Sequence, residues 1–422
     1  MNFRSVALAA CLLLPCPLAV QSYDREIWTS FTNMNKVTSF AEGGDKIYVG
    51  TTGGIRRYDR FFERWLSPLT TLDGLPDNRV ENLRFDRNSG ELWFDTPTGN
   101  GRWLSRIETV LYGGERPAHL RPPRLRSSIP PVFPPFGYHL ESNHVQGPRW
   151  SYPITNVLID SWKILWMGTF GLGVGRADLA DRQLEFHQFG PIQENVTAIA
   201  RDGEKIWFGG GDTYRRSEQG ISRYDPQTES WEYFRPDDII GLNDTDVSTI
   251  LPDETEVWFG TSTGLVRLTK KDGHWITYRL GRRGSGRVTA LLRNEERLWI
   301  GTESGLAVLD LAADTVRTVA GSERFDIRAI AGGPDQIWAA TDLGLYQCDR
   351  EDVVWSLVPG PDQLTRNPVV GLSIHETGVW AASRTPPGLA HLPEPGAEWQ
   401  WFPLSEIGGS QRVALAADST RA

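Results

Sequence analysis

The stretch Ile206-Trp207-Phe208-Gly209-Gly210 is one of eight copies of a five-residue pattern, in which an aliphatic, an aromatic and a further apolar residue usually precede two small residues. Because the first three positions are all apolar, we expect a strand that is covered on both faces. The aromatic position recurs mostly about 40 to 50 residues apart, the repeat length of four-stranded propeller blades. Its copies are Tyr48, Trp93, Trp166, Trp207, Trp258, Trp299, Trp338 and Trp380.

Three further segments surround each copy and complete a four-stranded unit. In the fifth unit a β-branched segment at 247–250 precedes the pattern, a Gly-led segment at 264–268 follows it, and an aromatic segment at 275–278 comes last. One unit cannot bury both of its flat faces alone, so we predict an all-β fold, a single β-propeller of about eight four-stranded blades stacked about one axis. Strand-like segments at 27–31 and 412–416 suggest a terminus that latches the ring, with seven blades or a partial ninth as alternatives.

The composition is typical of a turn-rich sheet protein. The 422 residues include 43 Gly, 27 Pro and 17 Trp but 3 Met. Gly and Pro weaken helices, whereas tight turns require them. The formal net charge of −9 argues against nucleic acid as the main partner.

The N-terminus has the parts of a secretory signal peptide. One positive charge precedes a short apolar run that Pro15 and Pro17 interrupt, and small residues follow. We predict a signal peptide at 1–22 and a periplasmic or secreted β-propeller at 23–422. Pro15 disfavours lipid attachment at Cys16, and no later segment has the ~18 uninterrupted apolar residues of a membrane helix. We therefore do not expect the mature chain to be integral to a membrane.

The repeat resembles the two-component-regulator propeller repeat. The resemblance rests on Trp-Phe-Gly-Thr at 258–261, the Gly-Leu-x-Arg that begins at Gly264, the aromatic segment that begins at Trp275, and inter-blade turns such as 73–78. It covers roughly residues 27–416. The resemblance implies a periplasmic sensor propeller like those of bacterial hybrid histidine kinases, or an exported stand-alone member. Kinase-linked members continue into a membrane helix and signalling domains, so we do not expect direct signalling by this chain.

A Pro-rich insertion at about 108–149 interrupts the second blade. We expect the fourth strand of that blade at 150–152, after the insertion, so that the insertion joins the third strand to the fourth on the face opposite the inter-blade loops. Loops of this length are usually functional or disordered. We expect this segment either to dock an envelope protein or to form a lid over the neighbouring blade; the candidate docking residues are Phe133, Phe136, Tyr138 and His139.

A second candidate site lies on the other face of the predicted ring. There the inter-blade loops and the loops between second and third strands gather around the channel mouth. Guanidinium forks match carboxylates and aromatic faces stack on sugar rings, so a sugar or carboxylate-bearing ligand would fit residues of these types. The candidates are Phe170, Asp212, Tyr214, Arg215, Arg216 and Arg384.

No catalytic motif stands out. The histidines lack metal-ligand spacing, no nucleophile elbow or phosphate-binding loop is present, and the segment 86–90 reads as a hairpin turn rather than a calcium loop. We predict an exported ligand- or protein-binding propeller with no cofactor, no metal and no intrinsic catalysis. The alternative is a propeller enzyme of the lyase or lactonase type, with a metal-assisted site in the central channel built from scattered loops.

Overall fold

The computed structural model describes residues 29–120, 129–148, 150–211, 220–236, 238–280, 286–294, 296–332, 336–349, 355–375, 378–394 and 396–404. Strands dominate these residues, and the single α-helix is the one-turn α1 (Asp362–Thr365). Among the described residues no helix has the length and hydropathy needed to cross a bilayer.

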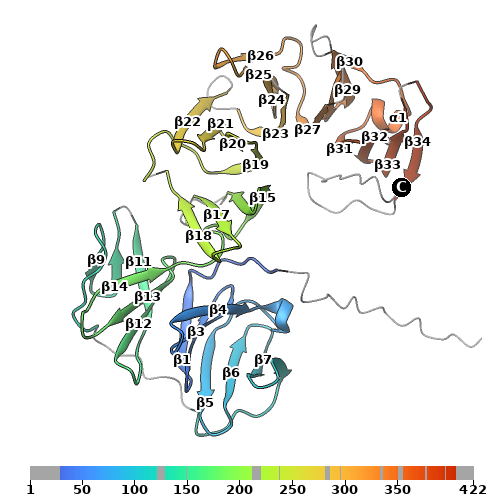
Figure 1. Ribbon diagram of the computed structural model, residues 1–422. Coiled ribbons are helices and arrows are strands. Elements are labelled where there is room, and N and C mark those ends of the chain that lie inside the picture. Colours follow the sequence, from blue (N-terminus) through green and yellow to red (C-terminus); the bar gives the residue numbers. More distant parts are fainter. Residues whose placement is uncertain are drawn as a thin grey trace, which may run out of the picture.

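The strands form eight antiparallel sheets, here called blades one to eight, as the repeat predicts (Figure 1). Seven of the sheets have four strands and the third has six. Blades one to four comprise β1 (Val37–Glu42), β2 (Lys46–Thr51), β3 (Gly54–Asp59) and β4 (Arg64–Leu69); β5 (Asn82–Asp86), β6 (Glu91–Thr96), β7 (Gly99–Leu104) and β8 (Thr109–Tyr112); β11 (Ser151–Ile159), β12 (Ile164–Thr169), β13 (Val174–Asp178) and β14 (Leu184–His187), with β9 (His139–Glu141) and β10 (His144–Gln146) beside β11; and β15 (Val196–Asp202), β16 (Lys205–Gly210), β17 (Ile221–Asp225) and β18 (Ser230–Phe234).

Blades five to eight follow the same plan. They comprise β19 (Val247–Pro252), β20 (Glu256–Thr261), β21 (Gly264–Thr269) and β22 (His274–Arg279); β23 (Val288–Arg293), β24 (Arg297–Thr302), β25 (Gly305–Asp310) and β26 (Thr315–Thr318); β27 (Ile327–Gly332), β28 (Gln336–Thr341), β29 (Gly344–Asp349) and β30 (Trp355–Leu357); and β31 (Val369–His375), β32 (Gly378–Arg384), β33 (Pro387–Leu392) and β34 (Gln400–Pro403).

The aromatic residue of the pattern occupies the same place in successive blades. Trp207, Trp258 and Trp299 are each fully buried on the second strand of their blade, and each lies opposite an Ala or Leu of the first strand. An Asp at or just after the end of the first strand accepts a hydrogen bond from the indole in blades four and five: Trp207 Nε1 donates to Asp202 at 3.1 Å, and Trp258 Nε1 donates to Asp253 at 3.3 Å. The matching positions confirm the repeat as the unit of the fold.

A common joint connects consecutive blades. A Cβ added to Gly209 of blade four would lie 2.6 Å from Val247 of blade five, and one added to Gly260 would lie 2.5 Å from Val288 of blade six. A first-strand hydroxyl also donates to the next blade, as from Thr197 Oγ1 to Val247 O at 2.5 Å. The small residue of the pattern therefore lets the β-branched first strand of the next blade approach closely.

Blade three departs from a ring in chain order. A Cβ on Gly168 would lie 2.6 Å from Val37 Cγ1 of blade one, and Asn156 Nδ2 donates to Thr38 O at 2.6 Å. Blade three thus packs against the first strand of blade one. In a closed ring that follows chain order, blade eight would occupy this place. The physical reason is that all these joints use the same chemistry, which does not distinguish one blade from another. Figure 1 shows blades one to three as one group and blades four to eight along an arc.

The segment 29–36 lies between the two groups of blades (Figure 1). Our predicted outer strand at 27–31 is wrong where it can be seen, because residues 29–31 are not in a strand. The Phe31 ring instead packs on blade four, with its centroid 5.1 Å from that of Phe208 and 5.2 Å from that of Tyr224. This contact covers an aromatic face of blade four. Residues 27, 28 and 412–416 lie outside the described residues.

Candidate binding cleft between blades one and two

Most of the predicted channel mouth falls outside the described residues, namely Asp212, Tyr214, Arg215 and Arg216. Phe170 is 47% exposed, and Lys36 Nζ lies 5.0 Å from its ring centroid. Arg384 ends β32, and its buried Nε and Nη2 have no hydrogen-bond partner among the described residues. Neither residue lines the cleft between blades one and two or the seam cavity described below. The channel mouth therefore stays a prediction.

The insertion lies elsewhere than we expected. The fourth strand of blade two is β8, which pairs with β7, so our expected fourth strand at 150–152 is wrong, and the segment containing Phe133 and Phe136 joins blade two to blade three. The prediction failed because 109–112 lacks the aromatic pattern of other fourth strands, whereas 150–152 has it. We expected the insertion on the face opposite the inter-blade loops because we took it to join the third strand of blade two to the fourth. Since it joins two blades instead, that reason no longer applies.

The docking candidates lie on blade three. Phe133 N donates to Arg182 O at 2.8 Å, and Leu184 N donates to Phe133 O at 2.9 Å, so this segment extends the outer edge of β14. The Phe133 and Phe136 side chains are exposed, as is His139 at the start of β9. The Tyr138 ring instead packs with its centroid 5.6 Å from that of Phe186.

Histidines and carboxylates form no metal centre in the described part of the chain, where no group of three or more His, Cys, Asp or Glu is placed to hold an ion. The segment 86–90 is a hairpin turn between β5 and β6: Asn88 N donates to Asp86 Oδ1 at 2.9 Å, and Gly90 has a φ of 75°. His119 Nε2 lies 3.1 Å from Asp86 Oδ1. The backbone N–H of Asn88 and this histidine hold the pKa of Asp86 below its usual value.

A cleft of about 760 Å³ lies between blades one and two and is here called the basic cleft. The turns between first and second strands and between third and fourth strands of both blades form its walls, and Ser161 of blade three adds to them. Its charged lining residues are Lys46, Arg57, Arg60, Arg87, Arg106, Asp45 and Glu108. Five cations thus face two carboxylates, although the chain as a whole carries a net charge of −9.

Aromatic side chains line the interior of the basic cleft. Tyr48 and Trp103 are almost fully buried, and the Tyr48 ring stacks on Phe85 with a centroid distance of 5.7 Å and an interplanar angle of 16°. Burial, with the nearby Asp45 carboxylate, raises the pKa of Tyr48 to about 12, so its phenol is neutral at physiological pH. Of the three rings, the half-buried Phe85 leaves the most aromatic surface next to the cations of the cleft.

Arg57 is the central cation of the basic cleft. Its Nε and Nη2 donate to Ser67 O at 3.1 and 2.9 Å, and the guanidinium carbon lies 5.6 Å from the centroid of the Trp103 ring. No carboxylate lies within ion-pair distance of Arg57 among the described residues. Burial lowers the pKa of this guanidinium, an effect that Glu108 opposes, but the group stays charged near neutral pH.

The other cations differ in how far protein carboxylates neutralise them. Arg60 is buried and contacts Glu42 Oε1 at 3.1 Å and Asp160 Oδ2 at 3.5 Å, so it supports the structure. Arg87 is 70% exposed with one contact to Glu42 at 3.2 Å, and the exposed Arg106 has no ion pair in the described structure. Arg57, Arg87 and Arg106 are consequently available to an anionic ligand.

Sequence reasoning missed the basic cleft because its cations come from five different turns and strands. Arg57 follows the pattern of third-strand arginines, such as Arg223, which packs 5.0 Å from the Trp207 ring centroid. The pattern alone marks these residues as packing partners of tryptophan. Only the structure shows that Arg57 also faces a cavity.

No family model and no curated protein matches this chain. Similar solved structures include the extracellular domain of the putative one component system BT4673 from B. thetaiotaomicron (16% identity, covering 91% of this chain and 57% of that chain, TM-score 0.33) and that of the putative hybrid two component system BT3049 from B. thetaiotaomicron (16%, 85% and 55%, 0.37). Another is PorZ, a surface component of the type-IX secretion system of Porphyromonas gingivalis (15%, 85% and 55%, 0.42).

This chain spans slightly more than half the length of these neighbours. By its own sheets the chain is a β-propeller of eight blades that share a four-stranded plan. The close-packed joint recurs at the pattern glycines, such as Gly168, Gly209 and Gly260.

Proposed function

We propose that the chain is an exported binding propeller that holds an anionic ligand in the basic cleft. The observation that carries this proposal is the excess of cations over carboxylates around a cleft in a chain of opposite net charge. Export rests on the signal-peptide pattern at 1–22, which lies outside the described residues.

The cleft chemistry favours a carboxylate-bearing sugar. Arginine presents planar N–H forks that match carboxylates, and aromatic faces stack on sugar rings. Arg57, Arg87 and Arg106 supply the forks, and the half-buried Phe85 supplies an aromatic surface. A volume of about 760 Å³ lies within the range of roughly 300 to 1,000 Å³ typical of small-ligand sites.

Two earlier candidates stay part of this proposal as additional contacts. Phe170, Arg384 and the loop residues Asp212 and Tyr214 to Arg216 are proposed to contact a ligand at the channel mouth. The segment with Phe133 and His139 is proposed to dock an envelope protein from the edge of blade three, where Phe136 is exposed.

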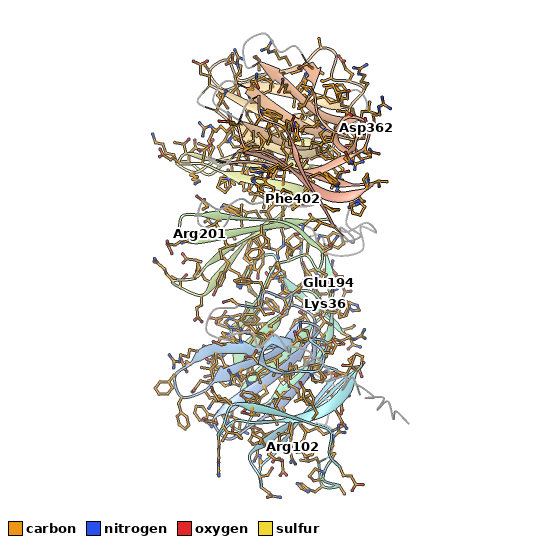
Figure 2. The ribbon with its side chains drawn as sticks, turned by 90° about the vertical axis from the view of Figure 1, so that its right-hand side faces the viewer. Lys36, Arg102, Glu194, Arg201, Asp362 and Phe402 are labelled. Atoms are coloured by element: carbon orange, nitrogen blue, oxygen red, sulfur yellow. The ribbon has the colours of Figure 1, made fainter. Side chains whose placement is uncertain are left out.

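The experiment measures binding of trigalacturonate by titration calorimetry, with maltotriose as the uncharged sugar of equal length. We expect trigalacturonate to bind at least tenfold more tightly, with an affinity that falls as salt rises, because exposed charges are screened. Arg106→Gln and Arg57→Gln should each weaken binding. Arg201→Gln is the matched control, because Arg201 (labelled in Figure 2) is 72% exposed on β15 of blade four and does not line the cleft.

Equal affinity for the two sugars, or unchanged binding in both cleft variants, would overturn the proposal. Cleavage of trigalacturonate during the titration would instead favour the enzyme alternative. Because Arg106 is exposed and has no ion pair in the described structure, its variant tests the cleft even if Arg57→Gln disturbs the contact with Ser67.

A further inference from the structure

A second cavity, of about 370 Å³, lies where blades one and four meet the segment 29–34. We call it the seam cavity. It is separate from the basic cleft, and the two share only Ser67 among their lining residues. The side chains used below are Phe31, Arg56, Phe189, Tyr224, Glu229 and Trp231.

Arg56 of β3 lines the seam cavity, and one nitrogen of its guanidinium is buried without a hydrogen-bond partner. Its Nε is buried and has no hydrogen-bond acceptor, and no carboxylate lies within ion-pair distance in the described part of the chain. The guanidinium carbon lies 4.3 Å from the ring centroid of Phe189 and 5.6 Å from that of Trp65. Burial lowers the pKa of Arg56 to about 10, with Glu229 opposing the shift. A charge that is desolvated without a partner is costly, and an anion in the cavity would offset that cost.

The other blades show that the fold does not need a charge at this position. Arg56 pairs with Val49, the third residue of the five-residue pattern in blade one. The residues in the equivalent register of the other blades are Gly101, Gly175, Ser222, Val266, Ala307, Tyr346 and Ala390. None of these seven is charged, so the arginine is a departure specific to the blade that lines the cavity.

Glu229 supplies the opposite charge in the same cavity. It lies in the turn between β17 and β18, its side chain is exposed, and no described cation lies within ion-pair distance of it. Asp73 also lines the cavity, but its Oδ2 already accepts a hydrogen bond from Thr70 N at 2.8 Å. The seam cavity thus has one cation and one free carboxylate that do not pair with each other.

Aromatic rings form the wall on the blade-four side of the seam cavity. The ring centroids of Tyr224 and Trp231 lie 4.8 Å apart, and Phe31 lies 5.2 Å from the first and 5.9 Å from the second. Such a wall accepts an apolar or aromatic group and also stabilises a nearby ammonium group through the ring faces.

We propose that the seam cavity binds a free α-amino acid with an apolar or aromatic side chain. The α-carboxylate pairs with Arg56, the α-ammonium pairs with Glu229, and the side chain packs on Tyr224, Trp231 and Phe31. A molecule that carries both charges uses both unpaired groups at once, whereas a simple anion or amine leaves one of them without a partner.

The test is titration calorimetry of the full chain with L-phenylalanine and two analogues. N-acetyl-L-phenylalanine lacks the ammonium group and 2-phenylethylamine lacks the carboxylate. We expect L-phenylalanine to bind at least tenfold more tightly than either analogue. L-Leucine serves as the aliphatic probe of the same class.

Two variants assign the charges. Arg56→Gln should bind L-phenylalanine no better than 2-phenylethylamine, and Glu229→Gln should bind it no better than N-acetyl-L-phenylalanine. Arg201→Gln is again the control and should bind as the unmodified chain does. If Arg56→Gln fails to fold by circular dichroism, the exposed Glu229 variant decides alone.

Absence of binding by both amino acids at millimolar concentration would overturn the proposal. Unchanged affinity in the folded variants would do the same. The proposal does not depend on the basic cleft, so trigalacturonate binding and amino-acid binding can fail separately.

Discussion

Replacing Gly260 by Ala tests the joint between blades five and six. The added Cβ would lie 2.5 Å from Val288 Cγ1 and 2.6 Å from Thr249 Cγ2, so at least one of the two blades must move. Overpacking of this kind costs roughly 1–3 kcal/mol. We expect the free energy of unfolding, measured by urea denaturation followed by tryptophan fluorescence, to fall by that amount.

The control for this prediction is Gly99→Ala. Gly99 begins β7, is exposed, and has no heavy atom within 4 Å of the position of an added Cβ. Gly-to-Ala changes at such sites stabilise by roughly 0.4–1 kcal/mol because they reduce the freedom of the unfolded chain. In the double variant Gly260→Ala/Val288→Ala the clash with Val288 Cγ1 is removed, so the two losses should be less than additive by ~0.5–3 kcal/mol. Strict additivity, or equal stability of the Gly260 and Gly99 variants, would refute the close-packed joint.

Three further predictions concern stability. Asp253→Asn should lower the free energy of unfolding by roughly 1–3 kcal/mol in urea denaturation at neutral pH. Burial acts to raise the pKa of Asp253, but hydrogen bonds from the backbone of Thr255 and Glu256 and the contact with Arg293 lower it below its usual value. The stabilisation by this carboxylate is therefore present above its unfolded pKa of about 3.9 and lost as the pH falls through the lower folded pKa. Equal free energies of unfolding for Asp253→Asn and the unmodified chain on both sides of that pH would contradict this. Burial lowers the pKa of His187, so thermal melts should show full stability above about pH 6.5 and a loss as the pH falls towards the lower folded pKa. The melting temperature of His187→Gln should depend less on pH, and the same pH dependence in both proteins would count against this prediction. Phe31→Ala should increase deuterium uptake at residues 29–36, and unchanged uptake would mean that other contacts hold this segment.

The strand plan was predictable because it repeats. The buried positions of Trp207, Trp258 and Trp299 recur with a fixed register, so eight imperfect copies reinforce one another. The fourth strand of blade two was not predictable in this way, because β8 is exposed on three of its four residues and needs no aromatic pattern. Local pattern identifies buried strands much better than outer ones.

The placement of blade three and the two cavities were beyond sequence reasoning for a different reason. Val37 accepts the small residue of blade three with the same chemistry that Val247 and Val288 use for their chain neighbours, so no residue type marks the partner. Arg56 and Glu229 are 173 positions apart in the chain, and only the packing of segment 29–34 against both blades places them in one cavity. The candidate loop with Tyr214 was selected for its length, its aromatic ring and its two arginines, and it lies outside the described residues.

The interchangeable joint between blades also bears on how such a gene can grow or shrink. A duplicated unit arrives with a small residue on one flank and a β-branched residue on the other, as in Gly260 and Val247 of blade five, so it fits beside any existing unit without adjustment of its new neighbours. Loss of a unit leaves two flanks that still match. Copy number can therefore drift under selection while each remaining sheet keeps its own sequence.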